Sequence, residues 1–293
     1  MKTIIYLLCI IFCVGCAEDI KQQENQMKIY AGGVDGLTLL KDPLVSQGYR
    51  FLGGNFFHHN VGWINQLTIW ERLAIEIVTR DHGHAAEFGP SNGPAHGRAL
   101  AQRLVDYYWQ YNINLDFIIL DLFAERREPT PEHWVDTCKH YRDIGYCNPI
   151  YPTFENGNHI DLHPTLLDNL VSKRQDFQEI IRFAGGIVLD SPPAFFLADQ
   201  PHRENYRRWV VDAMAWTRCF GGKVILIASP HRNEGTFLED TKKQLRYLER
   251  LNLTPDILIV ENYKGGWVGP DTDTTSCLGV ATELLEGRYV ISD

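Results

Sequence analysis

The stretch Asp256-Ile-Leu-Ile-Val-Glu-Asn-Tyr-Lys-Gly-Gly-Trp267 decides how the rest of the chain is interpreted. Its apolar run, Ile-Leu-Ile-Val, is too short for a helix and rich in β-branched residues, which is typical of a strand buried on both faces. The run ends abruptly in Glu261 and Asn262, followed by the aromatic residues Tyr263 and Trp267. The pattern predicts a buried strand that delivers a carboxylate, an amide and two rings to one end of a sheet.

The same pattern recurs along the chain, in alternation with helical segments. Further strands are predicted at 28–33, 85–88, 115–120, 147–152, 186–189, 223–228 and 288–292. Apolar residues at helical spacing predict helices at 63–79, 97–111, 131–144, 164–183, 203–219, 236–251 and 274–285, and 37–62 is interpreted as a long connection. Eight strands alternating with seven helices predict an α/β fold, a (β/α)8 TIM barrel that lacks the last helix. A doubly wound sheet is the alternative, but no GxGxxG follows the first strand.

Composition narrows the possible partners. The chain has 293 residues, 44% of them hydrophobic, which is enough for one large core. Its net charge is −9 with no basic patch, so we expect no nucleic acid partner. No phosphate-binding glycine motif and no zinc-like cysteine spacing occurs, so we expect neither a cofactor nor a metal.

The N-terminus has the features of an export signal. A short basic start precedes an apolar segment, 4–14, that is too short to span a membrane and ends in Cys13-Val-Gly-Cys16. This ending resembles the lipobox of bacterial lipoproteins. The resemblance implies that Cys16 is lipidated and anchors the protein to the outer membrane of the cell envelope. Residues 17–27 would then be a tether and 28–293 a single barrel domain. Acidic residues after Cys16 accompany surface export in some lipoprotein groups, and an ordinary cleaved signal peptide is the alternative.

The cysteines beyond this signal leave two interpretations open. Cys138, Cys147, Cys219 and Cys277 would remain in the mature protein. An exported protein is exposed to oxidising conditions, and Cys138 and Cys147 flank a predicted helix-to-strand turn, so they could pair. Buried free thiols are the equally acceptable alternative.

Polar residues follow the predicted strands where each strand ends. In a TIM barrel the active site lies at the carboxyl ends of the strands. Those ends carry Asp35, Glu87, Asp121, Glu155, Asp190, His231 and Glu261. Any one of them could simply cap the following helix. As a set they would converge on one crevice, which favours a catalytic or binding role.

Aromatic residues are interleaved with these acids, and the combination suits sugar rings, which stack their C–H faces and hydrogen-bond through their hydroxyls. Glycoside hydrolysis needs two carboxyl groups that flank the scissile bond. Glu155 and Glu261 are the first catalytic pair that we predict, with Asp190 and Asp121 in reserve. The predicted substrate-binding residues are Asp35, Glu87, Asn156, His231, Asn262, Tyr263 and Trp267.

This arrangement resembles the large clan of retaining TIM-barrel glycosidases, with Glu155 after the fourth predicted strand and Glu261 after the seventh. In that clan the acid/base Glu follows strand 4 and the nucleophile Glu follows strand 7. The resemblance implies those roles for Glu155 and Glu261. The clan has Asn before the first of these Glu residues, whereas here Phe154 precedes it and Asn156 follows it.

The sequence therefore predicts a lipid-anchored enzyme that degrades oligo- or polysaccharides, most simply a glycoside hydrolase. A polysaccharide lyase or a metal-dependent hydrolase on the same barrel is one alternative. His82-Gly-His84 resembles the metal-binding pair of amidohydrolase barrels, but it precedes a predicted strand instead of following one. A glycan-binding lipoprotein without catalytic activity is the alternative from another class.

Overall fold

A computed structural model of the chain describes the barrel strands and the helices of the C-terminal half. The described residues are 27–33, 52–57, 73–78, 102, 110, 115–121, 142–143, 145–155, 178, 181–199, 201–230, 234–262 and 275–285.

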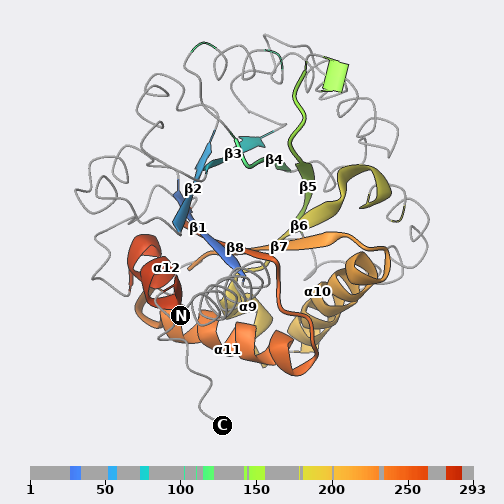
Figure 1. The fold of residues 1–293 in the computed structure, drawn as a ribbon. Helices are drawn as coiled ribbons and strands as arrows, with labels where there is room; N and C mark the ends of the chain where they lie inside the picture. Colours follow the sequence, from blue (N-terminus) through green and yellow to red (C-terminus); the bar gives the residue numbers. More distant parts are fainter. Residues whose placement is uncertain are drawn as a thin grey trace, which may run out of the picture.

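Eight parallel strands close into one barrel. They are β1 (Lys28–Gly33), β2 (Leu52–Phe57), β3 (Leu73–Val78), β4 (Phe117–Asp121), β5 (Ile150–Glu155), β6 (Gly186–Asp190), β7 (Lys223–Ala228) and β8 (Ile257–Asn262). Each strand pairs in parallel with the next, and β8 pairs with β1. Figure 1 looks along the axis of this ring. The predicted TIM-barrel architecture is therefore confirmed.

Alternation along the strands separates two sets of buried residues. Tyr30, Phe117, Ile119, Tyr151, Val188, Ile225, Ile227, Ile257 and Ile259 belong to one cluster, inside the barrel. Their neighbours along each strand, such as Ile118, Leu189 and Val260, belong to the larger cluster that packs against the helices. The register partners can be followed from strand to strand around the ring. A path that starts at Glu261 of β8 and passes through β1 to β7 comes back to the chain at Leu253, eight residues before its start. This is the shear of a (β/α)8 barrel.

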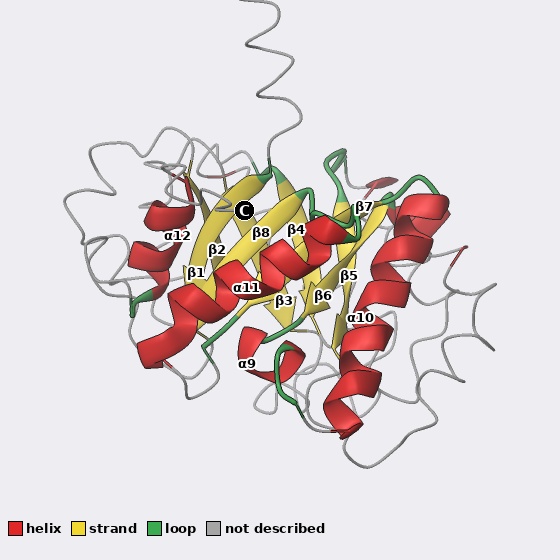
Figure 2. Cartoon of the chain, turned by 90° about the horizontal axis from the view of Figure 1, so that it is seen from below, coloured by secondary structure: helices red, strands yellow, loops and turns green. Residues whose placement is uncertain are grey.

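The described helices lie outside the barrel, on the side of β1, β6, β7 and β8 (Figure 2). They are α9 (Pro193–Phe196), α10 (Pro201–Cys219), α11 (Phe237–Arg250), which follows the short 3₁₀ helix η2 (Glu234–Thr236), and α12 (Cys277–Leu285). α10 contacts β6 and β7, and α12 contacts β1 and β8. Buried residues on α10, such as Val210, Ala213 and Met214, place its apolar face against the strands. The helices predicted at 203–219, 236–251 and 274–285 are confirmed to within a few residues.

Aromatic side chains fill the amino-terminal half of the barrel interior. The ring of Phe117 lies 5.1 Å from the ring of Tyr30 and 5.7 Å from that of Tyr151, in edge-to-face geometry. The hydroxyl of Tyr30 donates to Oδ2 of Asp116 at 2.6 Å, just ahead of β4. Gly186 makes room for this cluster, because a Cβ there would meet the carbonyl oxygen of Lys223 and approach Tyr151.

Two predictions in the first third of the chain are wrong. Residues 73–78 form β3, not the end of a helix over 63–79, and 52–57 form β2 inside the segment interpreted as a connection. Leu67, Leu73 and Ile77 imitate helical spacing, and the apolar run of β3 is interrupted by Glu76, so its alternation was obscured. Two Gly and one Asn in β2 give it weak strand propensity.

The strand numbers of the later elements change as a result. Glu155 ends the fifth strand instead of the fourth, and Glu261 lies in the eighth strand instead of the seventh. The segments 85–88 and 288–292, predicted as strands, lie outside the described residues, and the ring is complete without them. α12 follows the eighth strand.

β5 begins at Ile150, three residues later than predicted. The side-chain amide of Asn148 donates to the carbonyl oxygen of Leu115 and so fixes the turn that leads into the strand. Cys147 lies in this turn as an exposed free thiol; Cys138 lies outside the described residues. Cys219 is also an exposed free thiol, and Cys277 is a buried cysteine at the start of α12.

Candidate active site

Carboxylate residues of five strands share the positions that alternate onto the barrel interior. Asp121 and Asp190 have the parity of Ile119 and Val188 on their strands, and Glu261 has that of Ile259. Glu155 pairs in register with Asp190, and Glu76 with Ile119, so these two have the same parity. All five positions lie in the carboxyl-terminal half of their strands, where TIM barrels hold their active sites.

The shear sorts these acids by height along the barrel axis. With a shear of eight, residues at one height come from alternate strands and form layers of four. Asp121, Asp190 and Glu261 fall in one layer, which Phe57 of β2 completes. Glu76 belongs to the layer below and Glu155 to the layer above. We call the layer of Asp121, Asp190 and Glu261 the acid layer.

The acids are withdrawn from solvent to different degrees. Glu76 and Glu261 are buried, with 2% and 3% of their surfaces exposed, whereas Asp190 is half-buried. Glu155 and Asp190 are direct register partners on adjacent strands. Neighbouring strands lie about 4.8 Å apart, so the backbones of these two residues approach as closely as sheet geometry allows.

The backbone beside Asp190 is fixed by three elements. The hydroxyl of Tyr206 on α10 donates to the carbonyl oxygen of Asp190 at 3.1 Å. The amide of Ser191 donates to the carbonyl oxygen of Ile227 at 3.0 Å. Gln244 on α11 is fully buried and donates through Nε2 to the carbonyl oxygen and the Oγ of Ser191, at 3.2 and 2.9 Å. Such supporting hydrogen bonds hold a functional side chain in one geometry.

The structure places only part of the predicted site. The strand register puts the positions of Asp121, Glu155, Asp190 and Glu261 on the interior of one barrel. Asn262, the last residue of β8, has the opposite parity to Glu261 and pairs in register with Gly33. The remaining predicted site residues, Cys16, Asp35, Glu87, Asn156, His231, Tyr263 and Trp267, lie outside the described residues.

Glu76 is a carboxylate of this set that the sequence did not predict as a site residue. The residue was placed in a helix, where a Glu attracts no attention because helix surfaces are commonly charged. The signal that could have found it is the lone carboxylate within the apolar run Leu73-Ala-Ile-Glu-Ile-Val78, since a strand that buries both faces seldom carries a carboxylate.

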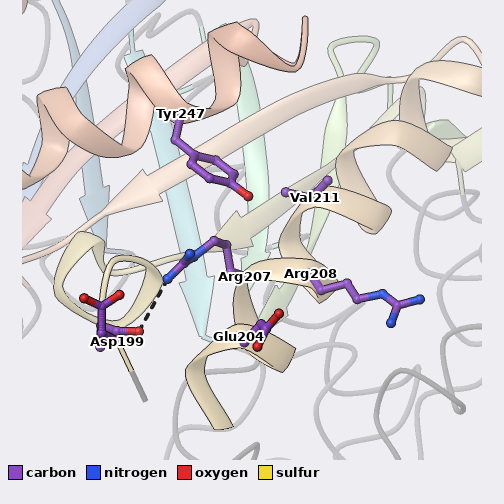
Figure 3. Close-up of a pocket in the computed structure, with 7 residues that line it drawn as sticks. Asp199, Glu204, Arg207, Arg208, Val211 and Tyr247 are labelled. Atoms are coloured by element: carbon purple, nitrogen blue, oxygen red, sulfur yellow. Dashed lines mark hydrogen bonds between the residues drawn. The ribbon is translucent and has the colours of Figure 1, made fainter. Parts of the chain in front are cut away.

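A separate cavity of about 550 Å³ lies outside the barrel, between α10, α11 and the segment that follows α9 (Figure 3). Tyr247 of α11 points toward Arg207 of α10, whose guanidinium lies 5.6 Å from the ring centroid. Arg207 also donates through Nε to the carbonyl oxygen of Phe196 at 2.8 Å. No acid of the barrel interior lines this cavity, so it is distinct from the candidate active site.

Two further features bear on the predicted alternatives. Among the described residues, no group of three or more His, Cys, Asp and Glu is placed to hold a metal ion. His82 and His84 lie outside that part of the chain. In the same part, no helix combines the length and apolar character that crossing a membrane requires.

No protein-family model matches the sequence, and neither does any curated protein. Solved structures with a similar fold include the catalytic domain of a family GH18 chitinase from the fern Peteris ryukyuensis, with 11% identity, a TM-score of 0.49 and coverage of 88% of this chain and 99% of that one. Active domain 2 of a chitinase from Pyrococcus furiosus is also similar, with 10% identity, a TM-score of 0.48 and coverage of 81% of this chain and 85% of that one. An aldolase from Escherichia coli K12 has 10% identity, a TM-score of 0.44 and coverage of 93% of this chain and 97% of that one. These proteins differ in activity, and the similarity concerns the barrel.

Proposed function

We propose that this protein hydrolyses glycosidic bonds in oligo- or polysaccharides. The observation that carries the proposal is the convergence of carboxylate positions from five strands on one end of one closed barrel. Such a set does not stabilise a protein core, because buried carboxylates lose solvation and repel one another. Glycoside hydrolysis requires paired carboxyl groups, one to protonate the leaving oxygen and one to act as nucleophile or base.

Glu155 and Glu261 are the proposed catalytic pair, with Glu155 as acid/base and Glu261 as nucleophile. Their strands, β5 and β8, are three apart around the ring, which is also the separation between strands 4 and 7 of the retaining clan. The numbering differs by one strand while the separation is kept. Asp190 and Asp121 are the reserve pair, and their places in the acid layer support a role in substrate binding if they are not catalytic.

The lipidation of Cys16 is also part of the proposal. The lipobox-like segment supports attachment of the mature chain to the outer membrane, with the barrel exposed at the cell surface. Labelling of cells with radioactive palmitate would test it. Incorporation into the wild-type chain and its loss in Cys16→Ser would support the anchor. An unlabelled wild-type chain of reduced length would favour the ordinary cleaved signal instead.

The activity is tested with the purified full-length protein on a panel of bacterial, plant and host glycans. Glu155→Gln and Glu261→Gln remove a carboxyl group at nearly constant volume, and we expect each to lower turnover by about 100-fold or more. Glu239→Gln on the exposed face of α11 is the matched control and should behave like the wild type.

Other outcomes would identify another function. Activity that survives both Gln substitutions but disappears in Asp121→Asn or Asp190→Asn would move the catalytic pair to the reserve acids. Unsaturated products would indicate a lyase, and loss of activity with chelators a metal-dependent hydrolase. Glycan binding without any product would contradict hydrolysis and favour a binding protein.

A further inference from the structure

Two buried hydroxyl groups lie immediately beside the acid layer. Thr153 of β5 has the interior parity of Tyr151 and pairs in register with Val188, which belongs to the interior cluster. Ser229 follows β7 with the interior parity of Ile227. By the register, Thr153 falls in the layer below the acid layer and Ser229 in the layer above it.

Neither hydroxyl is hydrogen-bonded within the part of the chain that the structure describes. Both residues are completely buried, and neither Oγ1 of Thr153 nor Oγ of Ser229 has a hydrogen-bond partner among the described residues. Two buried threonines on helices, Thr217 and Thr241, behave differently. Thr217 and Thr241 each donate to a backbone carbonyl one turn earlier in their helices, at 2.7 Å. A buried hydroxyl without a partner costs stability, so native proteins usually supply one as solvent or ligand.

We infer that Thr153 and Ser229 are ligand-binding residues that hydrogen-bond the hydroxyl groups of a bound sugar ring in the acid layer. This inference rests on the proposed function and specifies how the same site holds its substrate. A hydroxyl group both donates and accepts, so Thr153 below and Ser229 above can each pair with a sugar hydroxyl whichever way its proton points. The carboxylates between them accept hydrogen bonds only, when ionised.

Binding of protonated imino sugars tests the inference without requiring turnover. The probes are 1-deoxynojirimycin and its galacto and manno isomers, which combine ring hydroxyls with a positive charge that suits an acid-lined site. Affinity is measured by calorimetry and thermal stability by the unfolding midpoint. The variants are Thr153→Val and Ser229→Ala, which remove one hydroxyl each, with Thr241→Val as the matched control.

If Thr153 binds the ligand, Thr153→Val should keep or raise the midpoint of the free protein, because no hydrogen bond is lost. The same variant should weaken probe binding by about five-fold, the effect of one hydrogen bond. Thr241→Val should do the opposite, lowering the midpoint by about 2 °C with unchanged probe affinity. Ser229→Ala should follow Thr153→Val.

Three results would overturn the inference. One is unchanged probe affinity in both variants, which would mean that the hydroxyls hold only water. Another is a fall in midpoint for Thr153→Val equal to that of Thr241→Val, which would mean a structural role. The third is the absence of probe binding to the wild type. Failure of the proposed function is distinguishable from failure of the inference. Binding of the probes through these hydroxyls without any product from glycans would support the inference and contradict hydrolase activity.

Discussion

The two halves of the barrel interior are built on the same strands and have opposite chemistry. The amino-terminal half holds Tyr30, Phe117 and Tyr151 in edge-to-face contact, with Ile225 and Ile257 beside them. The carboxyl-terminal half holds Glu76, the acid layer and two buried hydroxyls that have no hydrogen-bond partner among the described residues. Strand pairing and shear are the same in both halves, so the difference comes only from residue type. The comparison shows that one half stabilises the fold by packing, whereas the other half buries polar groups that do not stabilise it.

The largest effect is expected from a cavity in the amino-terminal half of the interior, which we call the aromatic half. Phe117→Ala should lower the free energy of unfolding by about 3–5 kcal/mol, because the packing of both flanking rings is lost and the site cannot collapse. Urea unfolding measures it. Phe183→Ala removes a ring that is 40% exposed and should change stability by about 0.5 kcal/mol or less. Equal effects of the two changes would mean that the aromatic half is not the core of the barrel.

Added volume in the same half should lower the free energy of unfolding by less than the cavity does. Gly186→Ala would bring a methyl group against the carbonyl oxygen of Lys223 and to 3.0 Å from Cε1 of Tyr151, so we expect a loss of about 1–3 kcal/mol. Gly235→Ala is the control, because no atom lies within 4 Å of its added Cβ. Thermal unfolding of the two variants gives the measurement. A stable Gly186→Ala protein would show that the aromatic cluster is loosely packed.

In the carboxyl-terminal half, which we call the acid half, a substitution should affect activity strongly and stability little. Glu261→Gln keeps the volume of the side chain and removes its charge, so we expect the free energy of unfolding to change by about 1 kcal/mol or less. Glycan turnover should fall sharply in the same variant. Urea unfolding and activity are measured on one preparation. Loss of several kcal/mol with activity retained would place Glu261 in the structural half of the comparison.

The smallest effect appears only at high pH. Burial, aided by the negative charge of Asp256, raises the pKa of Tyr151 to about 12. In the unfolded chain this phenol ionises near pH 10. Between about pH 10 and 12 the unfolded state loses the proton first, so stability that is intact below pH 10 is lost as the pH rises. Tyr151→Phe should lessen this alkaline loss in urea midpoints and leave stability near pH 7 almost unchanged. The same pH dependence in both proteins would contradict the assignment to Tyr151.

The sequence predicted the barrel because β4, β6, β7 and β8 each combine an apolar, β-branched run with an abrupt polar end. β2 and β3 escaped prediction for physical reasons. The Gly-Gly-Asn of β2 has no strand propensity of its own and is held by pairing with β1 and β3. β3 carries a buried carboxylate that interrupts the apolar run on which recognition of a short strand depends.

The acids at strand ends were predictable one by one, but their arrangement was not. Local sequence gives the parity of Asp190 or Glu261 along its own strand. The height of one relative to the other depends on the shear, which only the closed ring defines. Thr153 and Ser229 could not be found for a similar reason, since a missing hydrogen bond is a property of the folded environment.

The shared parity of the acids has an evolutionary consequence. Inserting or deleting one residue within β4, β6 or β8 would turn that strand's carboxylate from the interior to the helix-facing side and reverse the apolar residues beneath it. Changes in the connections carry no such penalty, because loops tolerate insertions. Proteins that evolve from this chain should therefore differ in the lengths of their connections and keep the lengths of their strands.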